Sequence, residues 1–202
     1  RNELHGDGNT YNQRYKNPEL PECTNCHMNL AASNEYHVSH LSTFSCYTCH
    51  SQNYNNCGSC HIGSEAGARI PSYQGFKIGM NPIPAERNYE YAVLRRSLTA
   101  PDSWQNYGTP LLTNFDSQPT YKYTTPHNII KITTRTGFKD GSGNWVPYTN
   151  CTEGCHISKN SDGTYNNKEL YLFDSDCIET WEKSANGGII VDGKLPASWQ
   201  VN

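Results

Sequence analysis

Eight of the nine cysteines in this chain fall into four close pairs, and a histidine directly follows each pair. Two residues separate the cysteines in CTNCH, CYTCH and CGSCH, whereas three separate them in CTEGCH. The four clusters are Cys23, Cys26 and His27; Cys46, Cys49 and His50; Cys57, Cys60 and His61; and Cys151, Cys155 and His156. Three of them lie within 39 residues, so no conventional apolar core can form there.

Three kinds of chemistry use such pairs. Four thiolates can close a tetrahedral zinc site, and disulfides are common in exported proteins, but neither requires a histidine after the second cysteine. Haem c does require it, because both thiols bond to the porphyrin and the histidine binds iron from one face. Histidine makes up only 8 of the 202 residues, so chance does not explain four such motifs. We predict four covalently attached haems c, with proximal ligands His27, His50, His61 and His156.

The fourth motif leaves an alternative open, because it has one extra residue between its thiols. That residue can bulge out of the attachment turn, so that Cys151 and Cys155 both hold a haem. Alternatively, Cys151 forms a disulfide with Cys177, and Cys155 alone holds the haem. Cys177 is otherwise expected to be a buried free thiol, with an intermolecular bridge as a further alternative.

The remaining histidines match the number of irons that need a second axial ligand. They are His5, His37, His40 and His127. Two imidazoles three residues apart lie on one face of a helical turn, about 5–6 Å apart at Cβ, so His37 and His40 suit two neighbouring haems. We predict bis-histidine ligation at all four sites. The alternatives are that one of these histidines is structural, that His37 and His40 hold zinc, or that Met80 serves one haem and raises its potential.

The composition agrees with an interior filled by cofactors. Only 35% of the residues are hydrophobic and the mean hydropathy is −0.79, yet 14 Tyr, 4 Trp and 5 Phe argue against disorder. We predict a single multihaem cytochrome domain over residues 1–202. It is mostly coil, with a few short helices and strands wrapped around a stack of four haems c. Residues 1–61 form an N-terminal arm and a three-haem segment, and residues 62–202 form a mixed β and coil segment with the fourth haem.

Local patterns in the second segment predict a few regular elements. Residues 85–98 predict a helix, and residues 119–138 alternate as strands do. Asp140–Gly143 is a turn signal. A helix is expected after Asp174 or Ser175, ended by glycines, and a last strand is expected over residues 188–192.

Charge and apolar runs restrict the partners. The net charge of −3 provides no basic footprint, which argues against nucleic acid. No apolar run approaches the roughly 18 residues that span a bilayer. Since the chain begins at Arg1, we expect that an export signal preceded it and that the protein acts outside the cytoplasm, at the cell surface or in the periplasm.

A chain with these four motifs, and with HVSH and TPHN as distal-ligand segments, resembles the OmcE-type cytochrome nanowires. The resemblance implies a continuous haem stack and a head-to-tail homopolymer, in which one haem takes its distal histidine from the next subunit. His5, on the arm RNELHGDGN, is the candidate for that contact. The alternatives for His5 are a ligand within its own subunit or a disordered terminal residue.

Iron with two histidine ligands has no open position for a substrate, so electron transfer is expected rather than catalysis. As the subunit of an extracellular filament, the protein would exchange electrons with other electron-transfer proteins and external acceptors. A discrete soluble tetrahaem shuttle between membrane partners is the alternative. A multihaem reductase with one open haem requires that one of the four spare histidines is not a ligand.

Overall fold

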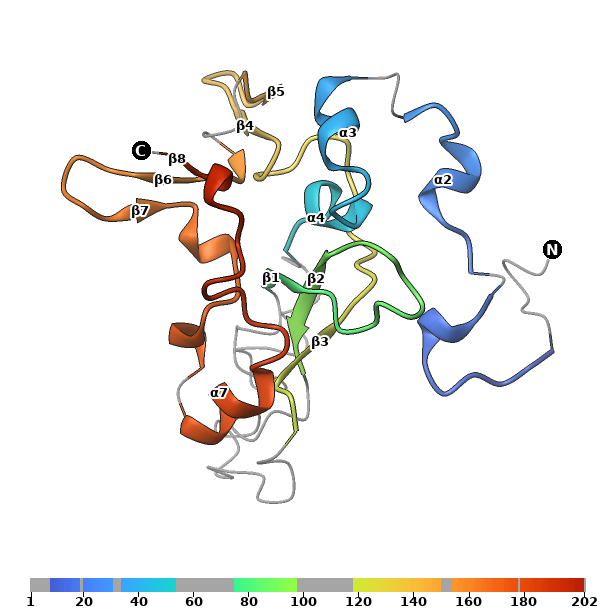
Figure 1. The fold of residues 1–202 in the computed structure, drawn as a ribbon. Helices are drawn as coiled ribbons and strands as arrows, with labels where there is room; N and C mark the ends of the chain where they lie inside the picture. The colour runs from blue at the N-terminus through green and yellow to red at the C-terminus, as the bar shows by residue number, and fades with distance from the viewer. Residues whose placement is uncertain are drawn as a thin grey trace, which may run out of the picture.

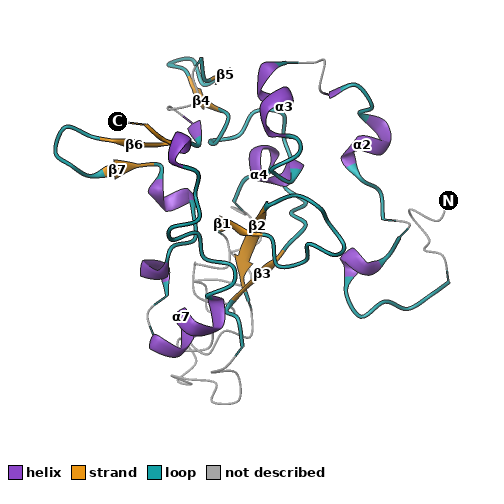
Figure 2. Cartoon of the chain, viewed as in Figure 1, coloured by secondary structure: helices purple, strands orange, loops and turns teal. Residues whose placement is uncertain are grey.

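The computed structural model describes residues 8–18, 20–30, 34–53, 75–97, 118–149, 154–177 and 179–201. Loops and turns connect short helices and strands (Figure 1, Figure 2). The α-helices are α2 (Cys23–Cys26), α3 (Glu35–His40), α4 (Cys46–His50) and α7 (Thr180–Asn186). The 3-10 turns are η1 (Arg14–Lys16), η6 (Lys168–Leu170), η7 (Asp174–Asp176) and η8 (Ala197–Trp199). The strands are β1 (Phe76–Met80), β2 (Tyr91–Arg96), β3 (Tyr121–Tyr123), β4 (Gly137–Lys139), β5 (Trp145–Pro147), β6 (Ile157–Lys159), β7 (Tyr165–Asn166) and β8 (Gln200–Val201).

An antiparallel sheet in the order β1-β2-β3 lies at the centre of the described residues. Ile78 pairs with Val93, and Leu94 pairs with Tyr123. The prediction of a helix over residues 85–98 is therefore wrong, since β2 occupies this region. A short continuous apolar run does not distinguish a buried strand from a buried helix. The first four residues of β2 are fully buried on both faces of the sheet.

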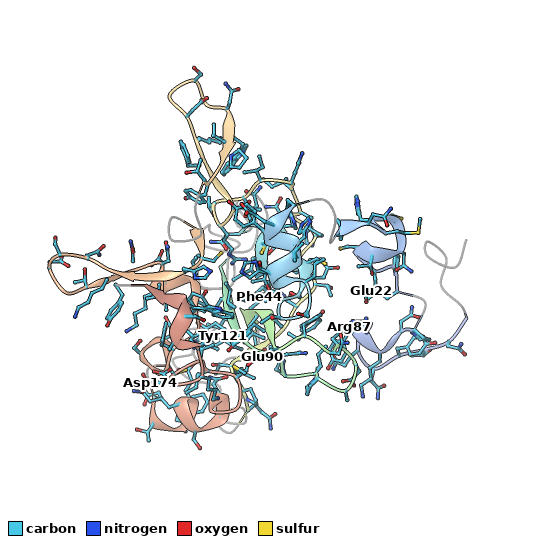
Figure 3. The ribbon with its side chains drawn as sticks, turned by 45° about the horizontal axis from the view of Figure 1, so that its top comes forward. Glu22, Phe44, Arg87, Glu90, Tyr121 and Asp174 are labelled. Carbon is cyan, nitrogen blue, oxygen red and sulfur yellow. The ribbon has the colours of Figure 1, made fainter. Side chains whose placement is uncertain are left out.

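Side chains from distant parts of the sequence pack on the sheet. One cluster contains Ile78, Tyr91 and Tyr171, and Phe44 and Trp199 pack against it. The rings of Phe44 and Trp199 stack with centres 5.0 Å apart. Phe44 lies between α3 and α4 (Figure 3), and its ring is also 5.4 Å from that of Tyr91 in β2, so these contacts fasten both helices to the sheet.

The predictions for residues 119–147 are confirmed in part. Strands form at the two ends of residues 119–138, as β3 and β4, with turns and coil between them. The expected turn at Asp140–Gly143 joins β4 to β5, and Asp140 N donates to the carbonyl of Asn144 at 2.9 Å. A third sheet has the order β7-β6-β8, in which β8 is parallel to β6.

The helix predicted after Asp174 or Ser175 forms as α7, but it begins later, because residues 174–176 form a separate 3-10 turn. Gly187 ends it, as expected. The strand predicted over residues 188–192 is wrong. Two isolated bonds, from Met80 N to Ile189 O and from Val191 N to Leu172 O, hold this segment to its neighbours without forming a ladder.

A buried polar network joins α7 to the central sheet. Arg96 Nη1 lies 2.8 Å from Glu182 Oε1, and both side chains are at most 6% exposed. Thr120 Oγ1 also donates to Glu182, and Asn186 Oδ1 accepts from Thr120 N at 3.1 Å. Because these partners come from β2 and from the residue just before β3, the network fixes how α7 lies against the sheet.

The segment that carries the first motif contacts the rest of the chain through an ion pair and through the ring of Tyr15, which packs edge-on against Tyr123 with ring centres 5.5 Å apart. Glu22, just before α2, forms a 2.7 Å ion pair with Arg87 in the β1–β2 connection (Figure 3). Neither α2 nor α3 buries any of its residues. The wrapping of this segment around haems stays a prediction. None of the helices in the described ranges has the length and apolar character needed to cross a membrane.

Candidate haem-binding site

Helix α3 presents two of the predicted distal histidines. Asn34 caps it, accepting a hydrogen bond from His37 N at 2.9 Å. The helix spans Glu35–His40, so His37 and His40 lie one turn apart on one face. The expectation that both histidines share a helical turn is confirmed.

Each of these histidines lies close to a predicted proximal histidine. The ring centres of His37 and His50 are 6.1 Å apart, and those of His40 and His156 are 6.2 Å apart. Two imidazoles that bind one metal ion from opposite sides have ring centres about 6 Å apart, since this separation contains two metal–nitrogen bonds of about 2.0 Å and the distance from each nitrogen to the centre of its ring. Both pairs therefore fit an iron held between two histidines.

The hydrogen bonds of these rings favour the ligand form of imidazole. Nδ1 contacts a backbone carbonyl oxygen in three of them: Leu30 O for His37 at 3.1 Å, Tyr36 O for His40 at 2.8 Å, and Lys131 O for His50 at 3.1 Å. A carbonyl oxygen only accepts, so Nδ1 carries the proton. The lone pair then sits on Nε2, the tautomer that metal-binding histidines adopt when a carbonyl orients them.

The ring of His156 is half-buried just before β6. Burial lowers its pKa, and the charge of nearby His40 acts in the same direction. Both effects favour neutral imidazole, which is the form that binds a metal.

No family model, curated protein or solved structure matches the chain. The resemblance to cytochrome nanowires stays a prediction, and so does the presence of haem. What supports the site is the arrangement of its own residues.

The second motif forms α4 itself. Cys46 and Cys49 lie on one side of the helix and His50 ends it. The thiol of Cys46 also reaches Cys23 at the start of α2, and this hydrogen bond lowers the pKa of Cys23. The first and second motifs are therefore neighbours, and both thiols are free. The other two residues of the first motif, Cys26 and His27, are exposed.

Cys155 of the fourth motif is partly buried, and like Cys49 of the second motif it lies near Arg135. Its Sγ is 3.5 Å from the carbonyl oxygen of Arg135, and Tyr171 Oη donates to its carbonyl at 2.6 Å. Cys177 is a free thiol and only 2% exposed, in agreement with the default prediction. Its alternative partner, Cys151, lies outside the described residues.

His127 is exposed, and the chain that follows it runs beside the chain that follows α4. Gln52 N donates to Asn128 O at 3.1 Å, and Ser51 forms an antiparallel bridge with Ile129. His127 therefore lies near residues 51–53, which directly follow the second motif.

Several predicted site residues lie outside the described residues. They are His5, Cys57, Cys60, His61 and Cys151. Met80, the alternative distal ligand, is the last residue of β1 and packs against the core cluster.

Within the described ranges, no three or more His, Cys, Asp or Glu side chains gather into a group that could hold a metal ion. The two histidine pairs offer two protein ligands each. That number suits iron in a porphyrin, whose ring supplies the other four donors, whereas zinc in a structural site takes four ligands from the protein.

Two residues near the site were missed by the sequence analysis. Thr133 Oγ1 donates to the carbonyl of Cys49 at 2.6 Å, and the guanidinium of Arg135 donates to the carbonyl of Thr48 at 3.0 Å. Both lie more than 80 positions from the second motif. No spacing rule connects residues so far apart, and only the fold brings them together.

Proposed function

We propose that this protein is an electron carrier with four haems c, each iron held between two histidines. The observation that carries the proposal is the pair of imidazole separations, 6.1 Å for His37 and His50 and 6.2 Å for His40 and His156. Both pairs join a histidine that directly follows a cysteine pair to one that belongs to no cysteine motif.

The residues have distinct roles in this proposal. Each cysteine pair would hold the porphyrin covalently, and the iron would supply one-electron oxidation and reduction. The two imidazoles fill both axial positions, so no position is open to a substrate. Their Nδ1–H bonds to backbone carbonyls fix the ring orientation and raise the basicity of Nε2.

The remaining assignments follow from position. His127 is the candidate for the third motif, because Asn128 and Gln52 hold the two segments together. His5 then remains for His27, either of the same chain or of a neighbouring copy. A contact to a neighbouring copy is heterologous and produces an open filament unless the rotation closes a ring.

We further propose that the protein is the repeating subunit of an extracellular filament that carries electrons to external acceptors. The motif layout and the resemblance to cytochrome nanowires support this. Electron microscopy of the natively purified protein tests it. Uniform filaments are expected, whereas discrete particles would favour a soluble periplasmic shuttle.

Electron transfer is tested on the purified protein by intact-mass measurement and optical spectroscopy. We expect a mass increase equal to four haems, which survives denaturation, and a low-spin spectrum that carbon monoxide leaves unchanged after reduction. A chain without covalent haem, holding zinc or disulfides instead, would refute the proposal. Carbon monoxide binding to one haem would instead favour the multihaem reductase.

A further inference from the structure

Arg135 is a buried cation between two of the predicted haem attachment sites. Only 4% of the surface of this residue is exposed to solvent. Nη1 donates to the carbonyl of Thr48, next to Cys49, at 3.0 Å and to Ser51 Oγ at 3.4 Å, and Nη2 donates to the carbonyl of Phe76 at 3.0 Å. On the other side, Sγ of Cys155 lies 3.5 Å from the backbone oxygen of Arg135.

All of these side-chain partners are neutral, and no carboxylate of the described residues forms an ion pair with Arg135. Arg96, the other buried arginine, differs, since Glu182 neutralises it at 2.8 Å. Burial lowers the pKa of Arg135, while the nearby thiols of Cys155 and Cys49 act to raise it. Arginine stays protonated in proteins, so a full positive charge remains beside both thiols.

Burying a charge without a partner is costly. Neutral donors and acceptors could hold the same carbonyls, so the hydrogen bonds alone do not account for a cation here. A positive charge favours the reduced form of a nearby iron, because reduction removes one positive charge. A unit charge at about 10 Å, in a medium with an effective dielectric constant of about 20, changes such an equilibrium by roughly tenfold.

We propose that Arg135 is a positioning residue that raises the reduction potentials of two haems, the one attached through Cys46 and Cys49 and the one attached at Cys155. This inference rests on the proposed function. Arg135 binds neither iron, and it acts through its charge and through the backbone groups that it holds.

Spectroelectrochemical titration of the fully loaded protein tests the inference. In Arg135→Gln, the midpoint potentials of two of the four haems are expected to fall by about 59 mV. At a fixed applied potential, the ratio of reduced to oxidised haem at these two sites then falls roughly tenfold. Arg135→Lys keeps the charge and should leave these potentials near their original values. Lys122→Gln removes the same charge from an exposed side chain of β3 and serves as the matched control.

A second route keeps Arg135 in place, in case Arg135→Gln does not fold. Ser51→Asp adds a carboxylate opposite Nη1 and should lower the same two potentials, whereas Ser51→Ala removes only a hydrogen bond and should not. The inference would be overturned if the potentials in Arg135→Gln moved no further than those in Lys122→Gln. Equal shifts in Arg135→Lys and Arg135→Gln would also overturn it. Absence of covalent haem in the unmodified protein would instead refute the proposed function.

Discussion

Backbone carbonyl oxygens determine the tautomer of three of the four imidazoles in the site. The backbone carbonyls of Leu30, Tyr36 and Lys131 fix the proton on Nδ1, and each Nε2 is left as the donor. If any of these carbonyls faced elsewhere, the tautomer would be free to change. The peptide backbone around the site therefore controls the chemistry of the rings.

Replacing one distal histidine should open one iron only. We expect His37→Ala to make the haem of His50 five-coordinate and His40→Ala to do the same to the haem of His156, because each pair is separate. Each variant should bind one carbon monoxide per chain after reduction, measured by optical titration. Ser39→Ala, on the same helix, should bind none. Unchanged spectra in both histidine variants would contradict the pairing.

The thiol of Cys177 should react slowly in the native protein. Burial raises its pKa to about 11, from an ordinary value near 9. The thiolate fraction at pH 8 is then about a hundredfold lower, so alkylation should be slow and should accelerate as the pH rises toward 11. Mass spectrometry should find one alkylated thiol per chain after unfolding. No thiol after unfolding would point to the alternative disulfide with Cys151.

At the scale of elements, α7 depends on the buried pair of Arg96 and Glu182. Glu182→Gln keeps the shape of the side chain but removes the carboxylate charge that lies 2.8 Å from the buried guanidinium of Arg96. We expect a loss of about 3–5 kcal/mol in the free energy of unfolding, measured by urea titration with circular dichroism. Lys183→Ala removes an exposed pair on the same helix, 3.5 Å from Asp174, and should cost less than about 1 kcal/mol. Similar losses in both variants would contradict this account.

Local signals in the sequence predicted several elements correctly. The spacing of His37 and His40 indicated a shared helical turn, and the Asp140–Gly143 turn joins β4 to β5 as expected. These features depend on residues a few positions apart. The sequence therefore contains the information that fixes them.

The features that depend on distant contacts were not predictable. Tyr91–Arg96 is a strand because β1 and β3 flank it, although its apolar run also suits a helix. The count of spare histidines predicted bis-histidine ligation but not which ring faces which. The pairing of His40 with His156 depends on how α3 and the segment before β6 pack together.

For the whole molecule, we expect the central sheet to be more stable than the segment of α2 and α3 when no haem is attached. The sheet has its own apolar core, with Ile78, Tyr91 and Val191 fully buried, whereas α2 and α3 bury no residue. We expect protein made without haem attachment to be cleaved first within residues 8–40 by a protease, while fragments containing β1 and β2 persist. Mass spectrometry of the digest checks this. Equal protection of both regions would show that haem binding is not needed to order the N-terminal segment.

The two histidine pairs also differ in the length of chain that each one closes. His37 and His50 are 13 positions apart, whereas His40 and His156 are 116 positions apart. Closing the longer loop costs about 2 kcal/mol more in chain entropy. The longer loop also cannot close until the ribosome has begun to release the last quarter of the chain, which contains His156. Under the proposed haem ligation, the site at His50 should therefore fill before the site at His156 when haem is scarce.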